Sequence, residues 1–105
     1  MLIQINTDSN IEGDEALVKR AEALLRGTLE HFGEQLTRVE VHLSDQSSDT
    51  KSGNDDKRCL LEARLAGLQP IAVSHQAATL EQAILGAAEK LKHSLDSVLG
   101  RLGNR

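Results

Sequence analysis

Residues 37–45 read TRVEVHLSD, and apolar and polar side chains alternate along this segment. Val39, Val41 and Leu43 point to one face of an extended chain, whereas the charged and polar residues between them point to the other. The segment therefore predicts a β-strand with one face buried and one face in water. The rest of the chain must supply the layer that covers its apolar face.

Three further segments are predicted to extend this strand into a sheet. Residues 58–66 resume the alternation, residues 2–6 form a short strand, and a last strand lies at about residues 71–74, after a tight turn at Gly67. Residues 46–56 (QSSDTKSGNDD) contain no apolar residue. We therefore expect a flexible, solvated loop there, joining two antiparallel strands.

Two amphipathic helices are predicted to cover the sheet. From about Asp14 to Phe32 the apolar residues recur every three or four positions, and Gly33 can end this helix. A longer helix begins where Thr79 supplies an N-cap, with Gln82 three residues later. Its apolar stripe comprises Leu80, Ile84, Ala87, Leu91, Leu95, Val98 and Leu102. The order β-α-β-β-β-α predicts an α+β fold with two helices on one face of a four-stranded, largely antiparallel sheet.

The length and composition favour one globular domain. A chain of 105 residues suits a single domain, residues 1–105, and its 39% hydrophobic and 27% charged residues are typical of a folded protein. Polar residues follow Met1 too soon for a signal peptide, and no apolar stretch is long enough to span a bilayer. We therefore expect a cytoplasmic protein with no membrane partner.

The sequence carries no pattern typical of an enzyme, a cofactor site or a metal site. The four histidines lie at positions 31, 42, 75 and 93, without an HxH, HExxH or CxxC pattern, so a metal site would need a coincidence of tertiary structure. No glycine-rich phosphate loop is present. Cys59 falls in register with buried strand residues, and we expect an inert, structural thiol. We therefore predict no catalytic residue, no metal and no cofactor.

Charge is segregated along the chain although the net charge is −4. Residues 1–56 contain 12 acidic and 5 basic side chains, whereas residues 57–105 contain 4 acidic and 7 basic ones. A basic surface on the second half would suit RNA, although charged residues on a helix are usually only its solvated face. The candidate RNA-binding residues are Lys57, Arg58, Arg64, Lys90, Lys92, His93 and Arg101.

The scarcity of aromatic residues limits how RNA could be recognised. Phe32 is the only aromatic residue, and single-stranded RNA is typically bound by stacking bases on such side chains. We therefore expect contacts to the phosphates and 2'-hydroxyls of folded RNA, through shape and charge, as in double-stranded RNA-binding domains.

Several segments are similar to those of one known family. They are VEVHL at 39–43, CLLEA at 59–63, His31-Phe32 at the end of the first helix, and a last helix of the form xLxxAIxGxxxKL at 79–91. Together with the β-α-β-β-β-α order, they resemble the ribosome hibernation promoting factors, also called ribosome-associated inhibitors, ribosomal subunit interface proteins or sigma-54 modulation proteins. The resemblance covers nearly the whole chain, in its short form without a second domain.

The resemblance implies a fold like that of the double-stranded RNA-binding domain and a stress-related function. Such a protein binds the rRNA of the small ribosomal subunit, in the cleft for messenger and transfer RNA, and inhibits or pauses translation. By position, Lys90 matches the family's helix lysine and His93 stands where an arginine is common. Glu81 replaces a frequent tyrosine and Ser97 a frequent basic residue. We therefore expect weaker, more salt-sensitive binding.

A second hypothesis is a protein-interaction module of the same fold that no longer binds ribosomes. Its acidic first half would then meet a basic protein. Alternatively, Val98, Leu99 and Leu102 at the end of the last helix would pack on a partner, or on a second copy as a weak homo-oligomer. Cosedimentation with small subunits separates this hypothesis from ribosome binding.

Overall fold

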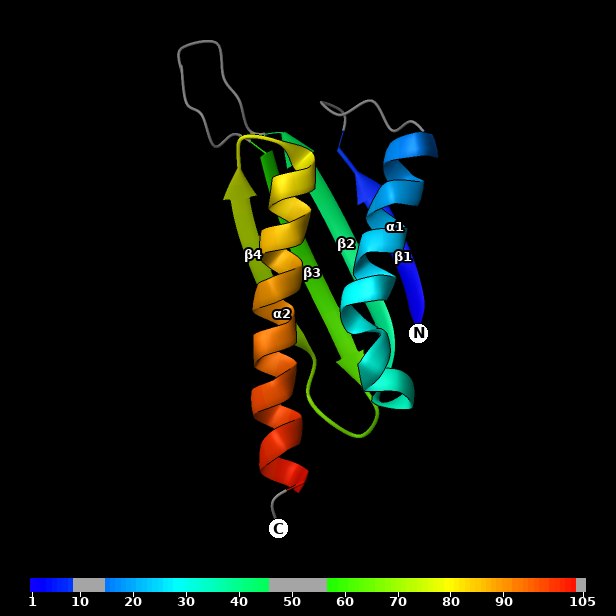
Figure 1. The fold of residues 1–105 in the computed structure, drawn as a ribbon, viewed down its shortest axis with the longest axis vertical. Helices are drawn as coiled ribbons and strands as arrows, with labels where there is room; N and C mark the ends of the chain where they lie inside the picture. Colours follow the sequence, from blue (N-terminus) through cyan, green and yellow to red (C-terminus); the bar gives the residue numbers. More distant parts are fainter. Residues whose placement is uncertain (9–14, 46–56, 104–105) are drawn as a thin grey trace.

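The computed structural model describes residues 1–8, 15–45 and 57–103, with side chains up to residue 100 (Figure 1). Its elements are β1 (Leu2–Thr7), α1 (Glu15–Leu29), the 3-10 helix η1 (Glu30–Gln35), β2 (Leu36–Asp45), β3 (Lys57–Leu65), β4 (Ile71–Ala77) and α2 (Leu80–Gly103). This β-α-β-β-β-α order confirms the predicted fold class. The predicted loop at 46–56 and the predicted helix start at Asp14 lie outside the described residues.

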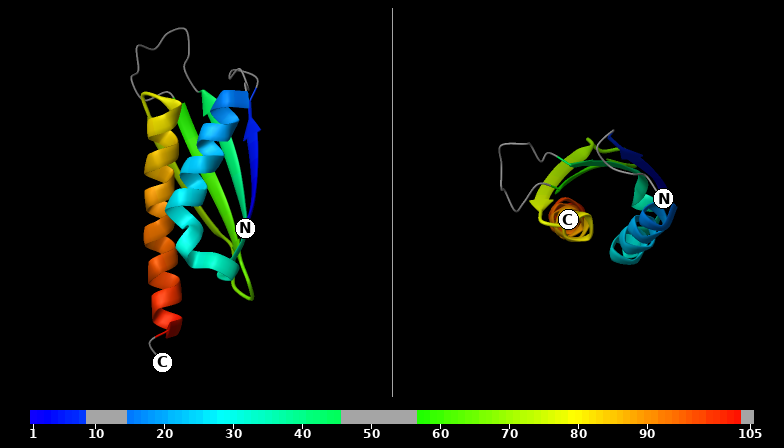
Figure 2. Two further views of the ribbon diagram at one scale, coloured as in Figure 1. Left: turned by 45° about the vertical axis from the view of Figure 1, so that its right-hand side comes forward. Right: turned by 90° about the horizontal axis from the view of Figure 1, so that it is seen from above.

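The four strands form one mixed sheet in the order β1-β2-β3-β4. β1 pairs with β2 in parallel, because the chain crosses back through α1 between them, and the other two pairs are antiparallel. Both helices lie on the same face of the sheet, which curves around them in the end-on view of Figure 2. The opposite face, called here the open face, has none of the described helices over it.

An aliphatic core fills the space between the sheet and the helices. The apolar residues of β2 that the alternation placed on one face, Val39, Val41 and Leu43, are all at most 1% exposed. Cys59 and Leu61 of β3 are fully buried beside them, and no buried polar or charged residue occurs among the described residues. The buried residues of α2 are Ala83, Ile84, Ala87, Ala88, Leu91 and Leu95.

The two predicted helix boundaries fare differently: the N-cap at Thr79 is confirmed, whereas the first α-helix ends before Gly33. Gly33 lies inside η1 with φ of +58°, in the left-handed region that favours glycine, and it kinks the chain two residues before η1 ends. The α-helix itself ends earlier, at Leu29, and Phe32 is buried from the 3-10 turn that follows. The backbone N–H of Gln82 donates to Thr79 Oγ1 at 3.1 Å, which confirms the N-cap of α2.

β4 is longer than its sequence predicts. The predicted strand ended at Ser74, but β4 continues to Ala77 because β3 offers it pairing partners up to its own first residue, Lys57. The polar residues His75 and Gln76 obscure this extension in the sequence. The length of an edge strand is set here by its neighbour rather than by its own hydrophobicity.

Candidate functional site

The candidate RNA-binding residues lie on two sides of the molecule rather than in one patch. Arg58 and Arg64 alternate along β3 with the residues buried under the helices, so both belong to the open face, as strand parity predicts. Lys90, Lys92 and His93 belong to α2, on the other side of the sheet. The structure therefore divides the predicted set into an open-face pair and a helix group.

Lys57 lies at the end of the β2–β3 strand pair and has an acidic partner. Its Nζ is 3.2 Å from Asp45 Oδ2, and the two residues stand directly opposite each other in the register. Both side chains are less than one third exposed. The charge of Lys57 is thus partly neutralised, so Lys57 is a weaker candidate for a phosphate contact. The side chain of Arg101 lies outside the described residues.

Lys90 has a contact within the protein that the sequence did not reveal. Its Nζ donates a hydrogen bond to the carbonyl oxygen of Ser74 at 2.9 Å, so the side chain reaches from α2 to the edge strand β4. Gly86, one helical turn earlier, explains this proximity. A Cβ at Gly86 would lie 2.1 Å from Cδ2 of His75, so only glycine lets the helix approach β4 this closely. The glycine and lysine of the xLxxAIxGxxxKL pattern therefore both serve the packing of α2 on β4.

The exposed surface of α2 is mixed in charge. Lys92 follows Lys90 after roughly 200° of helical rotation, so the two ammonium groups diverge around the helix. A shallow hollow of about 410 Å³ on this surface is lined by Glu89, Lys90, Lys92, His93 and Asp96. Two lysines and a histidine thus lie beside two carboxylates. An RNA phosphate would meet cations next to anions here, so each phosphate contact on this surface would be weak.

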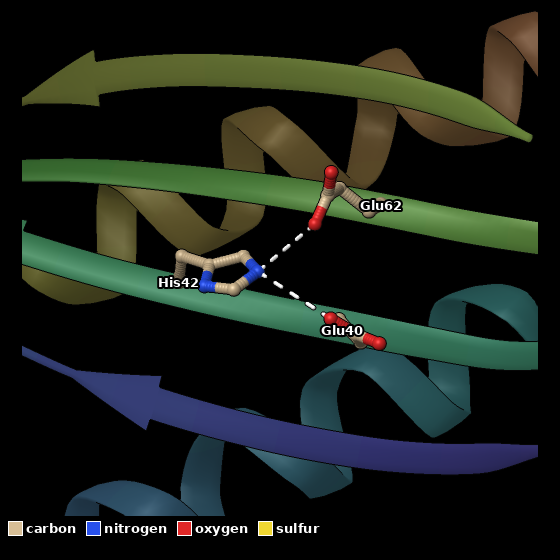
Figure 3. Close-up of side chains that lie close together, drawn as sticks. All are labelled: Glu40, His42 and Glu62. Carbon is tan, nitrogen blue, oxygen red and sulfur yellow. Dashed lines mark hydrogen bonds and ion pairs between the residues drawn. The ribbon is translucent and has the colours of Figure 1, made fainter.

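The open face carries a cluster that the sequence analysis missed. Nε2 of His42 lies 3.0 Å from Oε1 of Glu62 and 3.7 Å from Oε1 of Glu40 (Figure 3). Glu40 and His42 come from β2 and Glu62 from β3, and Glu40 stands opposite Glu62 in the register. The alternation alone places Glu40 and His42 on one face, but the approach of Glu62 requires the register of β3. This register cannot be read from the spacing of residues along the chain.

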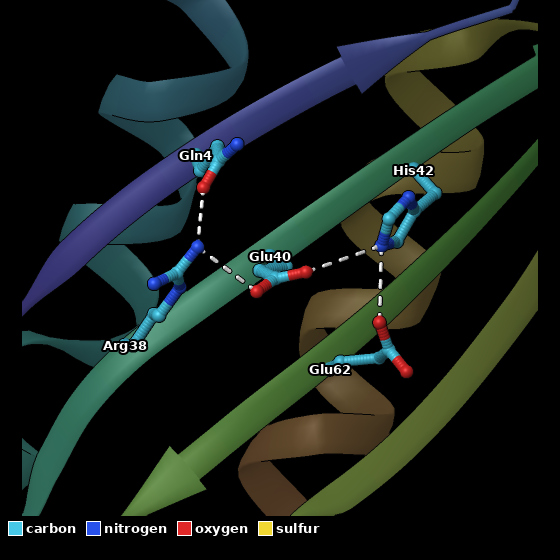
Figure 4. Close-up of polar contacts among 5 residues, drawn as sticks. All are labelled: Gln4, Arg38, Glu40, His42 and Glu62. Atoms are coloured by element: carbon cyan, nitrogen blue, oxygen red, sulfur yellow. Dashed lines mark hydrogen bonds and ion pairs between the residues drawn. The ribbon is translucent and has the colours of Figure 1, made fainter.

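A second pair of polar side chains extends this cluster toward β1. Nη2 of Arg38 lies 3.0 Å from Oε2 of Glu40, and it also donates to Oε1 of Gln4 (Figure 4). Arg38 therefore holds the carboxylate oxygen of Glu40 that faces away from His42. The result is a connected row of polar groups across three strands of the open face.

Cys59 has the environment of a structural thiol, as predicted. It is fully buried, and this burial raises the pKa of the thiol from 9.0 to about 12. A thiol with so high a pKa is almost entirely protonated near neutral pH and is therefore a poor nucleophile.

The described residues form an α+β fold whose candidate RNA-binding residues lie on two sides of the molecule. None of its described helices is long and apolar enough to cross a membrane. The family described as sigma 54 modulation protein / S30EA ribosomal protein matches residues 3–102, and the chain belongs to this family. The resemblance recognised from the sequence is thereby confirmed.

Two solved structures share this fold. A ribosomal subunit interface protein from Coxiella burnetii superposes with a TM-score of 0.76 at 16% identity, over 95% of this chain and 99% of that one. The N-terminal domain of Thermus thermophilus Protein Y gives 0.73 at 22% identity, over 93% and 99%. At such identities the likeness concerns the fold. A comparison with curated protein sequences gives no significant match.

Proposed function

We propose that the protein binds the small ribosomal subunit, through its rRNA, and inhibits or pauses translation as a hibernation factor. The observation that carries this proposal is the family match over residues 3–102, nearly the whole chain. The likeness to a ribosomal subunit interface protein over 99% of that chain supports it. A protein with a ribosomal partner would act in the cytoplasm.

The distribution of cations is consistent with docking inside a cleft. Arg58 and Arg64 lie on the open face, and Lys90, Lys92 and His93 lie on the opposite side of the molecule. A flat RNA surface would reach only one of these groups, whereas RNA walls on both sides of a cleft would reach both. Phosphate contacts from each side would add to affinity and would be screened by salt.

This function requires binding and no bond-breaking step. The protein would act by occupying space that messenger and transfer RNA need, so its surfaces matter more than any reactive group. Cys59, the most nucleophilic type of side chain in the chain, is buried and has a raised pKa. We accordingly propose that the protein is not an enzyme.

Sedimentation with purified ribosomal subunits tests the proposal. When mixed with small subunits, the protein should pellet through a sucrose cushion at low salt and pellet less at moderate salt. When mixed with large subunits instead, it should stay in the supernatant. An added excess should also reduce protein synthesis in a cell-free translation reaction. If the protein stays in the supernatant at both salt concentrations while the small subunits pellet, the proposal is rejected in favour of a protein-interaction module.

A further inference from the structure

The cluster of Glu40, His42 and Glu62 on the open face has the composition of a metal site. One imidazole nitrogen and one oxygen from each carboxylate all lie within 4.8 Å of one another (Figure 3). The sequence contains no metal-binding motif, but the tertiary structure brings three candidate ligands together. We propose that these three residues bind a divalent transition-metal ion of the Zn²⁺ type.

The distances between the ligand atoms suit such an ion. Tetrahedral Zn²⁺ binds nitrogen and carboxylate oxygen at about 2.0–2.2 Å, which places neighbouring ligand atoms roughly 3.3–3.6 Å apart. The two distances from His42 Nε2 are 3.0 Å to Glu62 and 3.7 Å to Glu40, one on each side of this range. The third distance, between the two carboxylate oxygens, is at most 4.8 Å, so the carboxylate groups need to approach each other by no more than about 1.5 Å.

The electrostatics of the strand pair favour a cation at this point. Glu40 and Glu62 face each other across the antiparallel β2–β3 ladder, an arrangement in which like charges repel. A divalent ion between their carboxylates would replace this repulsion with two attractions. It would also join β2 to β3 through side chains, in addition to their backbone hydrogen bonds.

The surroundings of Glu40 hold it in a ligand's orientation. Arg38 contacts Oε2 of Glu40, and Gln4 in turn accepts a hydrogen bond from Arg38 (Figure 4). Oε1 of Glu40 is thereby left facing His42. Carboxylates that bind metals are commonly oriented by such outer hydrogen bonds. The side chain of Glu62 is 50% exposed, so solvent can supply the fourth ligand of a tetrahedral ion.

The donor set predicts which ions bind. One imidazole nitrogen with two carboxylate oxygens suits Zn²⁺ and its transition-metal neighbours, whereas Mg²⁺ and Ca²⁺ prefer sites made entirely of oxygen. A protonated His42 between two carboxylates would account for the same contacts without a metal. The selectivity for Zn²⁺ over Mg²⁺ therefore separates a metal site from an ion pair within an acidic patch.

Calorimetric titration of the full chain with Zn²⁺, near neutral pH, tests the proposal. We expect one tight site per chain, undisturbed by a large excess of Mg²⁺. His42→Gln and Glu62→Gln should each weaken it by well over tenfold, and Arg38→Gln, which removes an outer contact, by about tenfold. Co²⁺ bound to the parent protein should give a visible absorption spectrum that His42→Gln abolishes.

The matched control is His31→Gln. His31 is also exposed and lies 3.9 Å from the carboxylate of Asp96, but it has no third ligand beside it in the described structure. This variant should bind Zn²⁺ like the parent. Circular dichroism would confirm that each variant is folded, and Glu62→Gln, which removes a like-charge contact, decides the matter if His42→Gln does not fold. The proposal is overturned if Zn²⁺ does not bind the parent, if it binds the site variants equally, or if Mg²⁺ displaces it at a similar concentration.

Discussion

Replacement of Gly86 by alanine tests the contact that brings α2 onto β4. The new Cβ would lie 2.1, 2.4 and 2.5 Å from Cδ2, Nε2 and Cγ of His75, all far inside van der Waals distance. Rotation of the imidazole ring about the Cβ–Cγ bond does not move Cγ, so this rotation cannot relieve all three contacts. His75 must adopt another rotamer or the helix must move.

The expected change in stability combines two opposing effects. Overpacking of this kind costs about 1–3 kcal/mol, whereas alanine is favoured over glycine inside a helix by roughly 1 kcal/mol. Gly86→Ala should therefore lower the free energy of unfolding by about 0–2 kcal/mol. In a His75→Ala background the clash disappears, and the same substitution should raise this free energy by up to about 1 kcal/mol.

Urea denaturation of the parent, both single variants and the double variant measures this coupling directly. We expect the change in the free energy of unfolding caused by Gly86→Ala to be more favourable by roughly 1–3 kcal/mol in the His75→Ala background than in the parent. The slope of this free energy against urea concentration should stay unchanged. An equal effect of Gly86→Ala in both backgrounds would show that the close packing of helix and strand does not limit this position.

Three further predictions concern Cys59 and the start of α2. Since burial raises the Cys59 pKa from 9.0 to about 12, the folded chain keeps a proton that the unfolded chain loses between these pH values. The free energy of unfolding should therefore fall as the pH rises from 9.0 toward 12. Urea unfolding at a series of pH values measures this fall, and Cys59→Ala should lack the contribution of the thiol. Cys59→Ser should cost about 1–3 kcal/mol, because it buries a hydroxyl in an apolar face, while ribosome binding per folded molecule stays unchanged. Thr79→Ala removes the hydrogen bond to the N–H of Gln82 and should cost about 1 kcal/mol in thermal or urea unfolding, whereas Thr79→Ser should cost much less.

Strand parity explains why the sequence predicted so much of the fold. The alternation in residues 37–45 separates the buried Val39, Val41 and Leu43 from the polar residues of the open face, and the structure follows this division. The 3-10 turn after Leu29 and the last three residues of β4 were not predictable in this way. Both depend on tertiary contacts, which override local preference.

The site was less predictable because its parts lie far apart in the sequence. Composition identified basic residues in the second half and strand parity placed Arg58 on the open face, but only the packing of α2 on the sheet shows that Lys90 reaches the edge strand β4. Likewise, the approach of Glu62 to His42 depends on the register between β2 and β3. Pattern and period assign a residue to a face, whereas neighbours across strands are fixed by pairing.

The salt dependence of small-subunit binding tests the central claim most directly. Affinities of the parent and of a Lys90→Glu, Lys92→Glu variant would be measured over a series of salt concentrations. The control is Lys19→Glu with Arg20→Glu on α1, which changes the net charge equally at exposed positions in the first half of the chain. Each lost phosphate contact should reduce the slope of log affinity against log salt by about 0.7–0.9.

If α2 faces rRNA, the Lys90, Lys92 variant should bind more weakly than the parent, and its slope should be shallower by about 1.4–1.8. The fold should survive, because both lysines lie outside the buried stripe and Lys90 loses only one exposed hydrogen bond to Ser74. The control should bind with nearly the affinity and slope of the parent. Equal affinities of the parent and the Lys90, Lys92 variant at every salt concentration would contradict the proposed docking of this helix on the small subunit.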